Sequence, residues 1–263
     1  MKIEPRYYLS TGLKLLLQNR KRVLVPAVLS SLVTILYSID NWLPINMQPV
    51  GIINNLGYAL LIFGLMYLSL LAYAGVLLVA KECLDSESST LLESYKESAK
   101  YAWPIFWYTI LFTIITFLVV PLFRWLISIV SYDFAKLCIL LAGLLIVLVI
   151  FSVFNLVMLS VVIDFQSKKR LRRCIELIKN NFVPVMLIII ISYSFVMIPT
   201  FLILLQSLEL NRTSIIINDV LYAVVEVFLV PYAAFVQIPL YRELKEQINN
   251  VDSNQQPIVN EQI

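Results

Sequence analysis

Glu226 is the residue whose position best suits chemistry inside a membrane. It lies near the middle of the apolar segment 215–240, and Pro231 follows five residues later. A proline within a helix leaves the carbonyl one turn earlier, here that of Val227, without its usual donor. A carboxyl group beside such a carbonyl could bind a cation or carry a proton. The alternative is that Glu226 is neutral and hydrogen-bonds between helices, which we favour because transporters usually line their path with several charged groups.

Asn155 is a second polar residue in an apolar segment, residues 137–163. A side-chain amide at this depth most simply bonds to a neighbouring helix. Glu226 and Asn155 are therefore the candidate intramembrane polar site.

Other kinds of site chemistry find little support in the sequence. There are no histidines, and the three cysteines, Cys83, Cys138 and Cys174, form no CxxC pair. These absences exclude His-based nucleophile systems and the usual metal sites. No phosphate-binding or hydrolase motif occurs either. We therefore predict a protein that is not an enzyme, with no cofactor and no metal.

Basic residues gather in two clusters that suit anionic lipid headgroups. We do not interpret them as a nucleic-acid site, because their distribution follows the membrane topology described below. The expected partners are membrane lipids and, as a further possibility, other membrane proteins. The candidate headgroup contacts are Arg20, Lys21, Arg22, Lys168, Lys169, Arg170, Arg172 and Arg173.

The composition indicates which elements position these residues. Of the 263 residues, 60% are hydrophobic and 14% are charged, whereas a soluble domain has about 45–50% apolar and about 25% charged residues. About 20 apolar residues span the bilayer as a helix. Segments without any charged residue are 23–39, 41–80, 101–123, 137–163 and 181–208, and segment 215–240 contains only two charged residues. The sequence thus predicts an all-α polytopic membrane helix bundle with six transmembrane helices.

The loops predict the orientation of this bundle in the cell membrane. All but three of the 20 basic residues lie before the first span, after the last, or in the loops that follow spans two and four. Basic residues remain on the cytoplasmic side. The N- and C-termini are therefore expected in the cytoplasm, with Cys83 and Cys174 accessible to thiol reagents there and Cys138 toward the outer face.

A threefold repeat organises the chain into units of about 5–85, 86–165 and 166–248, followed by a polar disordered tail, 249–263. Pro26, Pro104 and Pro184 occur at equivalent positions, separated by 78 and 80 residues. An amphipathic stretch with apolar residues at i, i+3, i+4 and i+7 precedes each proline. Because proline suits the first turn of a helix, each unit is predicted to be a short cytoplasmic surface helix followed by two spans. The three units are parallel.

These stretches resemble a known family. The sequence GLKLLLQN at 12–19 leading to Pro26, and LRRCIELIKNNF at 171–182 leading to Pro184, are similar to the membrane domain found ahead of some prokaryotic glycerophosphodiester phosphodiesterases and to its stand-alone relatives. The resemblance implies a six-span architecture. It implies no phosphodiesterase activity, because the soluble catalytic barrel of those enzymes has no counterpart here.

Two functional hypotheses follow from these features. The first is a non-enzymatic membrane protein that binds lipids or a partner through basic interfacial helices at 12–22 and 171–181. The second is a transporter or permease that uses Glu226 as a proton or cation site.

Overall fold

The computed structural model describes residues 4–42, 52–87, 89–165, 169–192 and 212–254, and all of its regular elements are α-helices, as predicted. The helices are α1 (Pro5–Trp42), α2 (Ile52–Asp85), α3 (Leu91–Ile129), α4 (Asp133–Ile163), α5 (Arg170–Asn180), a short helix Phe182–Ser192, and α7 (Arg212–Asn254). α7 thus continues past residue 248, where the polar tail is predicted to begin.

Several helices are long and apolar enough to cross a membrane. Four such spans lie within the described residues: Leu60–Asp85, Leu91–Ile129, Phe134–Ile163 and Asp219–Gln247. A fifth is obtained if α5 and Phe182–Ser192, which meet at an angle of 103°, are counted as one bent span. α1 is helical across the predicted span 23–39 but is not among these four, and the predicted span 181–208 extends beyond the described residues. The chain therefore has the helices of a multi-pass membrane protein.

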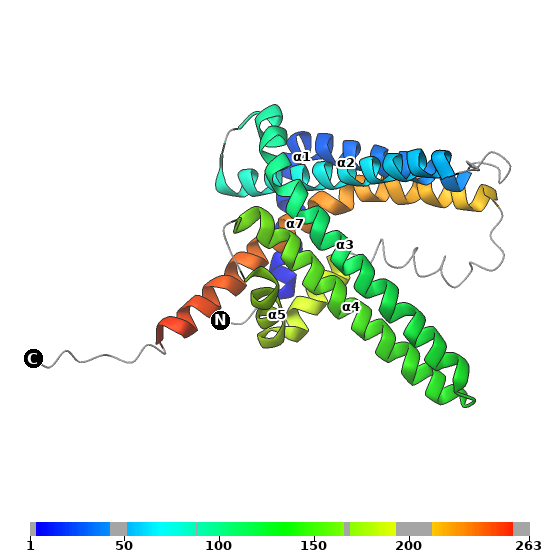
Figure 1. Ribbon diagram of the computed structural model, residues 1–263. Helices are drawn as coiled ribbons and strands as arrows, with labels where there is room; N and C mark the ends of the chain where they lie inside the picture. The colour runs from blue at the N-terminus through cyan, green and yellow to red at the C-terminus, as the bar shows by residue number, and fades with distance from the viewer. Residues whose placement is uncertain (1–3, 43–51, 88, 166–168, 193–211, 255–263) are drawn as a thin grey trace, which may run out of the picture.

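The long helices form two arms that diverge from a common region (Figure 1). α1, α2 and the first part of α7 lie together in one arm, and α3 and α4 form the other. We call the region where they converge the hub. It is built mainly from residues 74–80 of α2, 153–162 of α4 and 233–244 of α7.

The hub contains most of the buried core. Ala80, Leu159 and Ile238, which are 79 residues apart along the chain, are all at most 1% exposed. Beyond the hub the helices keep apolar side chains on their surface. Phe117 of α3 and Phe134 of α4, for example, are 76% and 79% exposed. Apolar surface of this extent is typical of segments that contact lipid.

The prolines correct one prediction. α1 continues through Pro26 and α3 continues through Pro104, so the prediction that these two prolines begin a new helix was wrong. A proline removes one backbone hydrogen bond, but the bonds of the adjacent turns keep a long helix continuous. The third unit behaves as predicted: α5 ends at Asn180, and Pro184 lies in the first turn of the next helix.

Candidate functional site

A buried carboxylate, Glu82, connects three helices at the hub. The side chain of this α2 residue is only 4% exposed. It accepts hydrogen bonds from the Ser94 hydroxyl of α3, at 3.0 and 2.8 Å, and from the Arg22 guanidinium of α1, at 3.3 Å. The Ser89 hydroxyl also donates to it. A buried carboxylate is stable only when it is paired and hydrogen-bonded in this way.

The end of α2 provides further acceptors for Arg22. After Asp85 the chain turns through Ser86, whose φ of 58° is left-handed, and the backbone N–H of Glu87 donates to the Glu82 carbonyl oxygen at 2.9 Å. This turn directs two carbonyl groups toward α1. The Arg22 guanidinium donates to the carbonyl oxygens of Glu87 and Ser89 at 3.1 and 2.9 Å.

The start of α3 positions the serine hydroxyl. Thr90 caps this helix: its hydroxyl accepts from the backbone N–H of Glu93, whose carboxylate accepts from the backbone N–H of Thr90. Such a capping box fixes the first turn of a helix. Ser94 follows directly and is therefore held against Glu82.

The C-terminal part of α7 joins the two arms by ion pairs. Arg242 donates two hydrogen bonds, of 2.7 and 2.9 Å, to the Asp85 carboxylate at the end of α2. Lys245 lies 2.5 Å from the Asp164 carboxylate at the end of α4, and the Tyr241 hydroxyl donates to the same carboxylate at 2.9 Å. The hub thus combines an apolar core with charged contacts along one edge.

The two residues of the predicted polar site contact different partners. The Ser30 hydroxyl of α1 donates to Glu226 at 3.4 Å, so this carboxyl group contacts a second helix, as the hydrogen-bonding hypothesis expects. Asn155 is buried, and its amide donates at 2.8 Å to the carbonyl oxygen of Phe151, one turn earlier in its own helix. These hydrogen bonds do not join Glu226 and Asn155 in one site.

The predicted headgroup contacts divide into outward and inward residues. Arg20, Lys21, Lys169 and Arg172 are exposed, and Arg172 pairs with Glu176 on the surface of α5. Two others point inward. Arg22 binds Glu82, and Arg170 donates to the carbonyl oxygens of Asp164 and Phe165. Arg173 is half-buried, and Lys168 lies outside the described residues.

The cysteines correct a second prediction. Cys174 is completely buried in α5, because it lies on the face of that helix that packs against the core. It is therefore not open to thiol reagents in the folded protein, contrary to the prediction. Cys83 is half-buried and Cys138 is exposed. No group of three acidic or cysteine side chains that could hold a metal ion occurs among the described residues.

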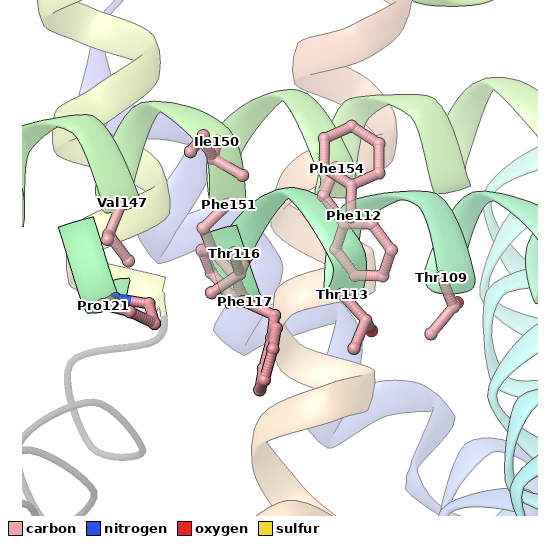
Figure 2. A pocket seen from close by; sticks show the side chains of 10 residues that line it. All are labelled: Thr109, Phe112, Thr113, Thr116, Phe117, Pro121, Val147, Ile150, Phe151 and Phe154. Carbon is pink, nitrogen blue, oxygen red and sulfur yellow. The ribbon is translucent and has the colours of Figure 1, made fainter. Parts of the chain in front are cut away.

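Two apolar grooves lie along the helices. The first, of about 640 Å³, runs between α3 and α4. Figure 2 shows Thr113 and Phe117 of α3 among its lining residues, beside Phe151 of α4. The second, of about 440 Å³, lies between α1 and α7 and reaches Ile191.

The charged residues of the hub have only a weak signal in the sequence. Asp85 and Asp164 occur where apolar segments end, 79 residues apart, which matches the repeat. Their partners cannot be found in this way, since Arg242 and Lys245 lie 157 and 81 residues further along the chain.

No protein-family model, curated protein or solved structure matches this chain. The resemblance to the membrane domain of the glycerophosphodiester phosphodiesterases therefore stays a prediction.

Proposed function

We propose that this chain is a non-enzymatic membrane protein that binds anionic lipid headgroups through the basic surface of α1 and α5. The proposed architecture has six spans in three parallel units, with both termini in the cytoplasm of the cell. In this proposal residues 23–39 and 181–208 are the two further spans beside the four long apolar helices, and 193–208 lie outside the described residues. The convergence of α2, α4 and α7 at one hub supports this arrangement.

One observation carries the lipid-binding proposal. Exposed cations and exposed apolar side chains occur together on the same helices. On α1, Leu13 and Leu17 are 52% and 60% exposed, close to Arg20 and Lys21, and on α5 Ile175 is 48% exposed beside Arg172. Helices of this kind insert apolar side chains at the bilayer interface while their cations meet anionic headgroups.

Lipid retention by the purified protein tests the proposal. The full chain is extracted from bilayers of mixed phosphatidylglycerol and phosphatidylcholine, and the retained lipids are counted by native mass spectrometry. A variant with Arg20→Gln, Lys21→Gln, Lys169→Gln and Arg172→Gln removes four exposed cations. At about 1 kcal/mol for each cation near the surface, we expect the preference for phosphatidylglycerol to fall at least tenfold.

The control variant removes cations from the other end of the molecule, at Arg124 and Lys136. It should retain the wild-type preference. An unchanged preference in the fourfold variant, with the helical content intact, would contradict lipid-headgroup binding and favour a protein partner for this surface.

Transport is the second candidate, and the position of Glu226 within an apolar segment of α7 favours it. A partly buried carboxyl group between α1 and α7 can exchange a proton or bind a cation. Ion and proton flux into proteoliposomes is compared between wild type and Glu226→Gln. Flux that is present in the wild type and lost in this variant, with the fold intact, would support the transporter. The absence of flux in both supports the lipid-binding proposal.

A further inference from the structure

The groove between α1 and α7 is apolar and open at its rim. Tyr232 contributes the main polar group of its wall, and its hydroxyl already donates to the carbonyl oxygen of Leu9 at 3.4 Å. The rim residues Leu13 and Phe228 are 52% and 56% exposed, so the groove is accessible from the outside of the bundle. Its volume of about 440 Å³ lies within the usual range of small-molecule sites, about 300–1,000 Å³. Its lining includes Leu13, Leu16, Ile191, Val225, Phe228 and Tyr232.

The α1 wall of this groove lies between cations. Arg6, Leu13 and Arg20 are spaced seven residues apart, which places them on one stripe of the helix at intervals of about 10 Å. Arg6 and Arg20 are exposed, as is Lys14 directly beside Leu13. α1 contains no acidic residue between positions 5 and 39. Positive charges of α1 therefore flank this wall of the groove.

The α7 wall of the groove has an acidic residue next to it, Glu226, but this residue contacts Ser30 rather than the groove. Glu226 follows the lining residue Val225 in α7, and its carboxylate accepts from Ser30 of α1. An anion at the mouth would consequently meet the α1 cations, while an apolar chain attached to it would meet Leu13 and Phe228. The cations therefore suit the anionic headgroup of a phospholipid, and the apolar groove suits its acyl chain.

We infer that the α1–α7 groove binds one acyl chain of a phospholipid whose anionic headgroup lies against Arg6, Lys14 and Arg20. This inference rests on the proposed lipid-binding function and assigns it a specific site. Headgroup charge would determine which lipid is selected, and the groove would determine where its chain is held.

Photolabelling of the full chain in nanodiscs tests the site. The probes are phosphatidylglycerol and phosphatidylcholine that carry the same diazirine group on one acyl chain, and labelled peptides are mapped by mass spectrometry. We expect labelling of peptides from the first half of α1 and from the middle of α7, at least about fivefold stronger for phosphatidylglycerol, the effect of about one cation. Leu13→Trp and Val225→Trp each fill the groove from its wall and should reduce this labelling to the phosphatidylcholine level or below.

Matched variants separate filling of the groove from general damage. Leu118→Trp introduces the same side chain at a 66% exposed position of α3 and should leave the α1 and α7 labelling unchanged. Arg6→Gln with Arg20→Gln leaves the groove open and should remove the preference for phosphatidylglycerol while phosphatidylcholine still labels. Thermal unfolding of each purified variant verifies that it is folded.

The outcomes distinguish this site from the proposed function. If phosphatidylglycerol is preferred but the two groove-filling variants label as the wild type does, this inference is wrong and the proposed function stands. If the two probes label every peptide equally in the wild type, the headgroup preference is wrong, and the proposed function fails with it. If neither probe labels the groove while phosphatidylglycerol is still retained, the lipid acyl chain binds elsewhere on the protein and the inference is overturned.

Discussion

Glu82 shows how a single residue can hold three helices together. Its carboxylate is buried and binds Arg22 of α1 and Ser94 of α3. A charge in such a place is costly unless its partners remain. Arg22 is partly exposed and also donates to the carbonyl oxygens of Glu87 and Ser89, so it keeps part of its pairing when Glu82 is removed. Removal of the Glu82 carboxylate should therefore destabilise the protein, because Arg22 and Ser94 lose a shared hydrogen-bond acceptor.

We expect Glu82→Ala to lower the free energy of unfolding by about 2–3 kcal/mol. This is less than the loss of about 3–5 kcal/mol when a fully buried ion pair is broken, because Arg22 is partly exposed and keeps two carbonyl acceptors. Glu82→Gln should cost less, because the amide oxygen still accepts from Ser94. Denaturant titration of the purified protein in detergent measures both. As a control, Glu176→Ala removes one partner of the exposed pair with Arg172 and should cost at most about 1 kcal/mol. Equal losses at Glu82 and Glu176 would show that the hub carboxylate is not buried as described.

Gly12 lies where α1 and α7 approach each other closely. A Cβ atom at this position would lie 2.3 Å from Cγ2 of Val236 and 3.2 Å from its backbone nitrogen. We expect Gly12→Ala to destabilise the protein by about 1–3 kcal/mol, as overpacking does. Gly64→Ala is the matched control, because a Cβ there meets nothing within 4 Å, and it should be neutral or stabilising by about 1 kcal/mol. The melting temperature should fall for Gly12→Ala and stay the same or rise for Gly64→Ala, and a stabilised Gly12→Ala variant would contradict the packing described here.

The sequence identified some of these residues and missed others for a physical reason. Glu226 stands out because a charge within an apolar segment is visible locally. Glu82 lies at the end of such a segment, where charges are common, and its role depends on Arg22, 60 residues away. Contacts at that separation depend on the packing of the helices, which composition and periodicity do not specify.

At the scale of elements, α5 is the helix that agrees best with its predicted form. Its apolar residues Cys174, Leu177 and Ile178 are buried, while Arg172, Glu176 and Lys179 are exposed. The periodicity was enough to predict this helix because one face packs on the core and the other does not. For α1 and α3 the same periodicity predicts the helices but not their length. The prolines within them do not end a helix that is stabilised on both sides by neighbouring turns.

The orientation of α5 predicts how the cysteines react. In detergent, Cys138 should be modified rapidly by a maleimide. Cys174 should react at least about tenfold more slowly, because the hub must open locally before the reagent can reach it. Peptide mapping after brief labelling compares the two rates, and labelling in denaturant provides the reference in which both react. Rapid modification of Cys174 in the folded protein would mean that α5 does not pack on the hub by this face.

At the scale of the whole molecule, the hub and the arms differ in what stabilises them. Among the described side chains of α4, the buried residues apart from Gly143 all lie in its C-terminal half, within or next to the hub. In the most apolar stretch of α3 only 6% of the stretch is buried within the protein, whereas the corresponding share in α7 is 53%. Apolar side chains that leave lipid for the protein gain packing but little hydrophobic free energy. Stability should therefore be concentrated where helices converge, and the arms should be tolerant of substitution.

Two phenylalanines test this distribution. Phe235 of α7 is completely buried in the hub, whereas Phe117 of α3 is 76% exposed. Phe235→Ala leaves a cavity and should lower the free energy of unfolding by about 2–3 kcal/mol. This is less than the loss of about 3–5 kcal/mol in a water-soluble core, because the transfer of the side chain out of lipid contributes little. Phe117→Ala removes the same atoms from a surface that faces lipid, so little packing is lost and we expect a cost of less than about 1 kcal/mol. Denaturant titration of both variants, reconstituted in the same lipid, measures the difference. A cost at Phe117 as large as that at Phe235 would show that the α3–α4 arm is covered by protein rather than by lipid.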